Sequence, residues 1–198
     1  MQKKPKIVLL DNNDSFTFNW VELLRQTVGV EPIVLGHDFD GEIPEADAYI
    51  FSPGPGLPSE KPLMLEVITK FGQQKPILGV CLGHQFIAEY FGAQLYNLGK
   101  LNHGLEVEVK TNEDAKIFKG VESSFNAALY HSWAVESESI KKTPLKAIAH
   151  YDSTIMALKH TTLPIVGFQF HPESFLTEVG KQLILNWLEG YVYPNMTS

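Results

Sequence analysis

One stretch of the sequence decides the fold, and it reads Ile77-Leu78-Gly79-Val80-Cys81-Leu82-Gly83. The continuous apolar run over residues 77–80 is typical of a strand buried on both faces, as in a parallel sheet. A helical pattern follows at once over residues 83–91, so Cys81 lies at the turn between strand and helix. The pattern Gly-x-Cys-x-Gly is that of a nucleophile elbow, in which flanking glycines leave room for a tight turn. We therefore expect the thiol at the carboxyl edge of a parallel sheet and at a helix N-terminus, whose dipole favours a thiolate.

The residues before this stretch repeat the alternation of buried strand and amphipathic helix. We predict strands over residues 6–10, 32–35, 48–51 and 77–80, and helices over residues 15–28, 63–71 and 83–91, with Asp14 or Ser15 capping the first helix. This order predicts an α/β fold in which a parallel sheet carries helices on both faces.

The residues after this stretch change in character. Residues 105–110 alternate apolar and polar side chains, as a half-buried strand does, and residues 126–130, 147–150, 155–158 and 166–170 also read as extended. A last amphipathic helix is expected over residues 177–188. We predict an open, largely parallel, flavodoxin-like central sheet with antiparallel additions. The length of 198 residues suits a single domain over residues 1–198.

Composition excludes several classes of protein. The chain has one cysteine, which excludes an internal disulfide and a zinc site built on several cysteines. The net charge of −7 argues against nucleic-acid binding, which needs a basic face. No apolar run approaches the roughly 20 residues that span a bilayer. The run over residues 7–10 is too short for a signal-peptide core, so we expect a cytoplasmic protein without membrane contact.

A thiol nucleophile needs a base, and His171 is the histidine best placed to be one. It follows the predicted strand over residues 165–170, so it should emerge at the same sheet edge as Cys81 if the two strands are parallel. Glu173 stands two residues on and is suited to orient the imidazole. The alternatives are a buried structural cysteine, a strand-end histidine bonded to backbone, and a plain surface carboxylate.

A loop that ends another predicted strand reaches this edge as well. It reads Ser52-Pro53-Gly54-Pro55-Gly56, in which prolines fix the backbone and glycines allow a ligand to approach closely. Such a loop is suited to present an N–H group to an oxyanion, beside the N–H of Leu82. A simple turn is the alternative.

These blocks together resemble the class I (triad-type) glutamine amidotransferases. The segments that carry the resemblance run over residues 52–56, 79–85 and 167–174. Residues 11–19 and Tyr130-His131-Ser132 narrow it to the glutaminase components of anthranilate synthase and of 4-amino-4-deoxychorismate synthase. The resemblance spans nearly the whole chain in order and spacing.

The resemblance implies a role for each matching residue. Cys81 is then the nucleophile that attacks the side-chain amide of L-glutamine, His171 the base and later the acid, and Glu173 the residue that orients His171. The remaining roles are backbone oxyanion donors, at Leu82 and Gly56, and a glutamine pocket made by Gly54, Pro55, Gly56, Gln85, Ser132 and Trp133. No metal or cofactor is implied for this chain; Mg²⁺ is expected on a chorismate-binding partner subunit that receives the ammonia.

Three positions depart from the family pattern. Relatives often have Lys at the position of Leu105, Leu at that of Trp133, and Tyr at that of Asn13. The choice between the anthranilate and the aminodeoxychorismate pathway, or a role in both, stays open. The competing hypotheses are the amidotransferase subunit of another synthetase, for GMP or carbamoyl phosphate, and a catalytically silent regulatory subunit.

Overall fold

The structure is a computed structural model that describes residues 3–99, 104–111 and 115–196. The helices are α1 (Thr17–Val28), α2 (Pro62–Phe71), α3 (Leu82–Tyr90), α4 (Ser137–Ile140) and α5 (Gly180–Trp187). The strands of the first half are β1 (Ile7–Asp11), β2 (Ile33–Gly36), β3 (Ala48–Phe51), β4 (Ile77–Val80) and β5 (Leu95–Asn97). Those of the second half are β6 (Leu105–Thr111), β7 (Ser124–Leu129), β8 (Trp133–Val135), β9 (Leu145–Tyr151), β10 (Thr154–His160) and β11 (Ile165–Phe168).

The central sheet is parallel on one side and antiparallel on the other. Among the described residues it has the strand order β2-β1-β3-β4-β11-β10-β9-β6-β7. The five neighbouring strands β2, β1, β3, β4 and β11 are parallel to one another. The four remaining strands, β10, β9, β6 and β7, each pair antiparallel with their neighbours. This confirms the predicted α/β fold with antiparallel additions, and it sets the elbow strand β4 beside β11 in the middle of the sheet.

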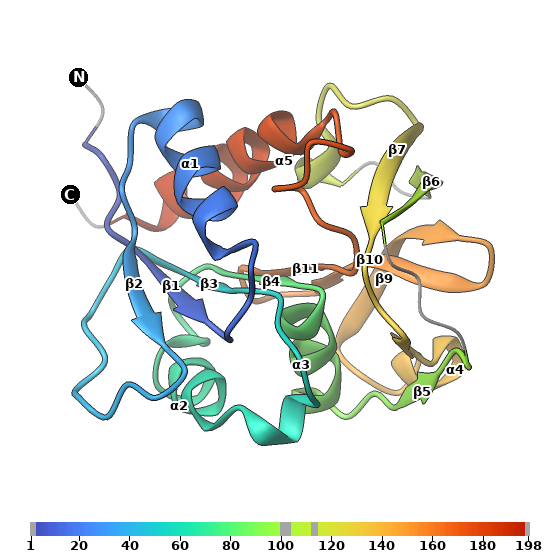
Figure 1. Ribbon diagram of the computed structural model, residues 1–198, viewed down its shortest axis with the longest axis horizontal. Coiled ribbons are helices and arrows are strands. Elements are labelled where there is room, and N and C mark those ends of the chain that lie inside the picture. Colours follow the sequence, from blue (N-terminus) through green and yellow to red (C-terminus); the bar gives the residue numbers. More distant parts are fainter. Residues whose placement is uncertain (1–2, 100–103, 112–114, 197–198) are drawn as a thin grey trace.

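Helices cover both faces of the parallel side (Figure 1). Alternate residues of β1 explain this arrangement, because successive side chains of a strand point to opposite faces. Ile7 and Leu9 belong to the hydrophobic cluster that includes side chains of α1 and α5, whereas Val8 and Leu10 belong to the cluster that includes side chains of α2 and α3. Both faces are therefore apolar, which is why these strands read as continuous hydrophobic runs.

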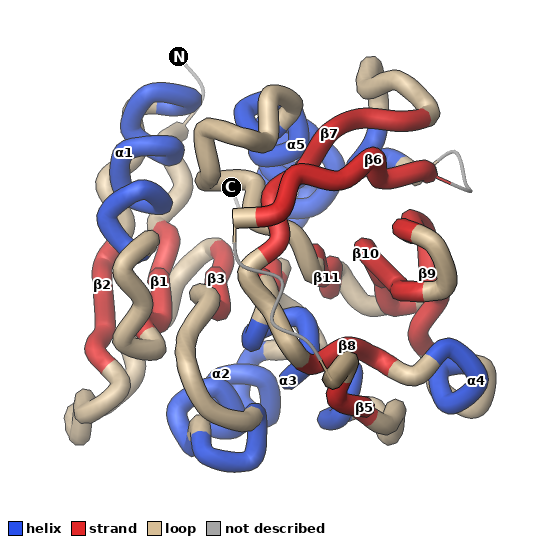
Figure 2. The backbone as a smooth tube through the Cα atoms, turned by 45° about the vertical axis from the view of Figure 1, so that its right-hand side comes forward, coloured by secondary structure: helices blue, strands red, loops and turns tan. Residues whose placement is uncertain are grey.

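The structure shifts several predicted boundaries by one to three residues and adds elements that the sequence did not predict. The last helix begins at Gly180 rather than at 177, because residues 171–180 form successive turns bonded Ser174 N to His171 O, Thr177 N to Ser174 O and Gly180 N to Thr177 O. The first helix begins at Thr17 without a side-chain cap, while Asp14 Oδ1 accepts the N–H of Phe16 in the turn before it. β11 ends at Phe168. The added elements are α4 and the small antiparallel sheet of β5 and β8, which is separate from the central sheet (Figure 2).

Candidate active site

The structure places Cys81 in a strained turn between β4 and α3. Its backbone has φ 51° and ψ −100°, a region that non-glycine residues rarely adopt. The turn is held at both ends, because Cys81 N donates to Phe168 O at 2.7 Å and Cys81 O accepts from Gln85 N at 3.0 Å. Strain of this kind amounts to about 1–3 kcal/mol and persists only where the surroundings enforce it.

Two glycines let α3 press against the sheet beside this turn. A Cβ on Gly83 would lie 2.6 Å from Phe51 Cβ, and one on Gly79 would lie 2.6 Å from Gly83 C. Real side chains essentially never make such short contacts, so only glycine fits at these positions. The flanking glycines of the predicted elbow are thus required by close packing around the thiol.

His171 and Glu173 reach the same edge from the neighbouring strand. β11 runs parallel to β4 with Gly167 opposite Gly79, so the residues that follow both strands emerge together. His171 Nδ1 lies 2.7 Å from Glu173 Oε1, and both side chains are buried. A carboxylate oxygen only accepts, so Nδ1 carries the proton. This leaves Nε2 as the nitrogen available for a proton from a thiol.

The electrostatics keep the imidazole charged over a wide pH range. Burial alone lowers the pKa of His171, but the charge of Glu173 and the side chain of Cys81 outweigh it. The net result is a pKa well above the usual histidine value. His171 Nε2 is buried and has no hydrogen-bond partner among the described residues. The arrangement sets a charged imidazole beside the side chain of Cys81, as activation of a sulfur nucleophile requires.

The loop before α1 covers the imidazole. The ring of Phe16 lies 5.5 Å from that of His171, and the ring of Tyr130 lies 4.8 Å from it, as measured between centroids. Asp14 lies close to both residues of the pair, and its pKa responds to their charges. Burial is the main cause that raises the pKa of Asp14; Glu173 raises it further, and His171 lowers it. The two aromatic rings therefore pack against the imidazole of His171, which is buried.

The loop over residues 52–56 is fixed beside the same edge. Ser52 Oγ accepts the N–H of Asn12 at 3.0 Å, and Ser52 O accepts from Asn12 Nδ2 at 3.0 Å. A Cβ on Gly54 would lie 2.6 Å from Asn12 O, and Gly56 has a φ of 87°. Pro55 stands between them. The loop thus follows β3 at the carboxyl end of the sheet, next to the end of β4.

The residues expected around the substrate's α-groups form a hydrogen-bonded strip. Gln85 Nε2 donates to Trp133 O at 2.8 Å, and His131 Nδ1 lies 2.8 Å from the same oxygen. Ser132 O accepts the N–H of Leu98 at 2.8 Å. The sequence did not single out Gln169, whose Oε1 accepts from Gln85 Nε2 at 3.1 Å. Its signal was a polar residue inside the apolar run over residues 165–170.

The three departures from the family pattern have different surroundings. Asn13 has φ 63°, a left-handed conformation that asparagine tolerates better than most residues, and its Nδ2 lies 3.2 Å from His37 Nε2. Trp133 is half-buried and offers its backbone to the strip described above. Leu105 is 41% exposed at the start of β6.

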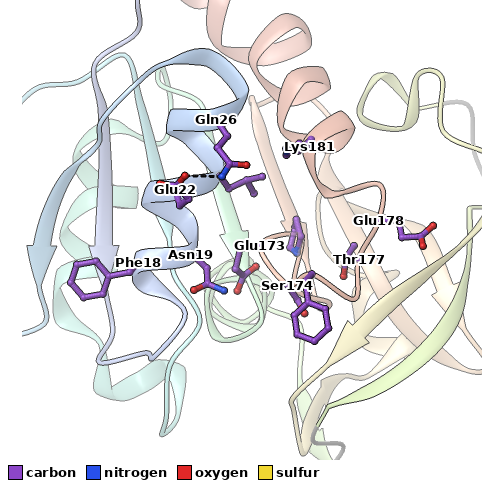
Figure 3. A pocket seen from close by; sticks show the side chains of 12 residues that line it. Phe18, Asn19, Glu22, Gln26, Glu173, Ser174, Thr177, Glu178 and Lys181 are labelled. Atoms are coloured by element: carbon purple, nitrogen blue, oxygen red, sulfur yellow. Dashed lines mark hydrogen bonds between the residues drawn. The ribbon is translucent and has the colours of Figure 1, made fainter.

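A cavity lies between α1 and the turns before α5 and adjoins the His171–Glu173 pair at Glu173 (Figure 3). Glu173 and Ser174 line it together with Phe18 and Phe175, which are 79% and 87% exposed. Cys81 and the 52–56 loop do not line it. The cavity therefore meets the candidate site only through Glu173 and Ser174.

The described part of the chain offers neither a metal cluster nor a membrane span. Within it, no group of three or more His, Cys, Asp or Glu side chains is arranged to hold a metal ion. In the same residues, no helix has the length and apolar character needed to cross a membrane.

Comparisons with known proteins identify the family of this chain. The family model described as glutamine amidotransferase class-I matches residues 8–190. Aminodeoxychorismate/anthranilate synthase component 2 of Bacillus subtilis is 39% identical over 93% of this chain and 96% of its own length. Anthranilate synthase component 2 of Thermus thermophilus is 40% identical over 95% of this chain and 94% of its own length.

Solved structures share the fold. A Thermoplasma acidophilum protein, described as a candidate GMP synthase subunit, superposes with a TM-score of 0.78 at 25% identity, and the match covers 94% of each chain. A glutamine amidotransferase from Thermotoga maritima has a TM-score of 0.70 at 17% identity, over 94% of this chain and 81% of its own. With its family model matched almost end to end, this chain belongs to the class-I glutamine amidotransferases.

Proposed function

We propose that residues 1–198 form one glutaminase domain, which hydrolyses L-glutamine through a thioester on Cys81 and delivers ammonia to a chorismate-aminating partner subunit. One observation carries the proposal. The only cysteine of the chain lies in a strained strand-to-helix turn beside a buried His171–Glu173 pair, and His171 Nε2 has no hydrogen-bond partner among the described residues. Such a pairing is what activation of a sulfur nucleophile requires.

The reaction divides amide hydrolysis into two steps. Cys81 Sγ attacks the side-chain carbonyl carbon of glutamine, and the tetrahedral intermediate collapses by breaking the C–N bond. His171 gives its Nε2 proton to the departing nitrogen, so ammonia leaves and a γ-glutamyl thioester remains. His171, now neutral, then takes a proton from water as the water attacks the thioester. Glutamate leaves, the thiolate returns and the imidazolium is restored.

Backbone groups supply the remaining stabilisation. The N–H of Leu82 belongs to the first residue of α3, so no helical carbonyl claims it, and it is suited to bind the oxyanion. The N–H of Gly56 is the second proposed donor, in a loop whose glycines allow close approach. Gly54, Pro55, Gln85, Ser132 and Trp133 are proposed to hold the substrate.

The names of the relatives support a chorismate-aminating partner. The relatives that match this chain at 38–40% identity are named as component II or component 2 of anthranilate or aminodeoxychorismate synthase. We propose that the chemistry on chorismate, with its Mg²⁺, belongs to the partner subunit. An amidotransferase subunit for GMP or carbamoyl phosphate is the second reading.

The test uses the chain in complex with a chorismate-binding synthase subunit. Cys81→Ala should abolish amination with glutamine and leave amination with free ammonia unchanged, because the partner holds the aminating site. Persisting glutamine-dependent amination would refute the assignment of the nucleophile. The product, anthranilate or the para-amino isomer, identifies the pathway. Absence of either product with both partner types would refute the chorismate proposal.

A further inference from the structure

We propose that Gln169 is a positioning residue for the substrate: it orients the Gln85 side chain so that Gln85 and His131 together fix the backbone at Trp133. Gln169 is fully buried, and no role was expected for it from the sequence. The inference rests on the proposed function for its choice of substrate, and otherwise on hydrogen bonds of this chain.

The direction of each hydrogen bond follows from the Trp133 carbonyl. That oxygen only accepts, so the Gln85 atom at 2.8 Å is an N–H donor, and His131 must carry its proton on Nδ1. The amide of Gln85 is thereby fixed, and its Nε2 also lies 3.1 Å from Gln169 Oε1. Both N–H groups of Gln85 are thus engaged, and Gln169 is the acceptor that holds the second one.

These bonds determine which backbone groups stay available to a ligand. Leu98 N donates to Ser132 O, so the backbone carbonyl of Ser132 points toward β5. Because backbone groups alternate in direction along an antiparallel strand, those of Trp133 point to the opposite side. The N–H of Trp133 points to the same side as its carbonyl, toward Gln85. The carbonyl of Trp133 already accepts from two donors, Gln85 and His131. The group of Trp133 that is then suited to bind a ligand is its N–H, which can donate to an anionic group such as an α-carboxylate.

A chain of hydrogen bonds therefore links the end of β11 to the strip. Gln169 directly follows the last residue of β11 and precedes His171 by two residues, and Gln85 stands one helical turn after Cys81. Losing Gln169 Oε1 would leave one buried N–H of Gln85 without an acceptor and free that side chain to rotate away from Trp133. Substrate binding should suffer, whereas the His171–Glu173 pair makes no hydrogen bond with Gln169.

The experiment compares two thiol reagents on Gln169→Met, which keeps the length of the side chain and removes its acceptor. Iodoacetamide reports the reactivity of Cys81 alone, and a chloroketone analogue of L-glutamine also needs the α-group contacts. We expect the chloroketone rate at low concentration to fall about fivefold, as for one neutral hydrogen bond, with the iodoacetamide rate unchanged. Gln182→Met is the matched control, because it removes a Gln182–Asn186 bond on α5 far from the strip.

Two further measurements complete the test. If Gln169 acts through Gln85, the double variant Gln85→Met/Gln169→Met should be no slower with the chloroketone than Gln85→Met. Multiplying effects, or an equal loss with both reagents, would overturn the inference. Hydrogen exchange of the Gln85 side-chain amide, followed by NMR, needs no substrate: protection lost in Gln169→Met supports the bond, and unchanged protection overturns it. A wild-type chain that the chloroketone labels no faster than iodoacetamide does would instead refute the proposed function.

Discussion

Replacing Glu173 with glutamine tests whether this carboxylate holds His171 in its charged state. The substitution keeps the shape of the side chain and an oxygen opposite Nδ1, but it removes a buried negative charge 2.7 Å from the ring. Glu173 is the first group that raises the pKa of His171 against the effect of burial. Removing its charge therefore lowers that pKa, and the imidazolium loses its proton at a lower pH.

The size of the effect on rate follows from the kind of bond that is lost. A hydrogen bond to a charged group contributes about 1.5–3 kcal/mol, against about 1 kcal/mol for a neutral one. The difference of about 0.5–2 kcal/mol, at about 1.36 kcal/mol for each factor of ten, slows glutamine hydrolysis about 2- to 30-fold. The loss grows toward alkaline pH, because the acid that protonates the departing ammonia titrates away sooner.

The assay is glutamate release by the complex with a synthase subunit, measured across pH for the wild type, Glu173→Gln and Glu178→Gln. The last variant makes the same charge change in the same segment, on a residue that lies outside the pair. The alkaline limb of the profile should move to lower pH in Glu173→Gln only. An alkaline limb that stays in place, or one that moves equally in the control, would refute the electrostatic role given to Glu173.

Two further predictions concern stability. Gly83→Ala would place a Cβ 2.6 Å from Phe51 Cβ, and such overpacking should reduce the free energy of unfolding by about 1–3 kcal/mol and the Tm by about 3–10 °C. Thermal unfolding checks this against Gly190→Ala, where the new Cβ has ordinary space, and equal Tm values would contradict it. Burial lowers the pKa of His84 to about 3 and that of His131 to about 4. As the pH falls below 6.5, both histidines bind protons in the unfolded chain while both rings stay neutral in the folded chain. Each histidine should therefore lower the free energy of unfolding by about 1.4 kcal/mol for each unit that the pH falls between 6.5 and 5. Urea denaturation measures this slope, which should be shallower in His84→Met; an identical slope would rule His84 out as its source.

The sequence predicts those parts of the structure that depend on local patterns. The buried strands β1, β3, β4 and β11 are continuous apolar segments. The turn at Cys81 is predictable because Gly79 and Gly83 flank the cysteine. The sequence did not predict the small sheet of β5 and β8, because both strands are short and their pairing joins residues far apart in the chain. The contact of Gln85 with Gln169 is likewise invisible in the pattern, since it needs α3 and β11 to be packed together first.

The close packing of α3 limits how this active site is able to change. Gly79, Gly83 and Gly167 each lack space for a Cβ, and the one on Gly167 would lie 2.9 Å from His84 Nδ1. A saturation mutagenesis scan would therefore mark these positions as intolerant although none supplies a reacting side chain. Redesign of the site for a longer or shorter amide has no freedom on this side of the thiol. A change of specificity must therefore come through the 52–56 loop or the strip at Trp133.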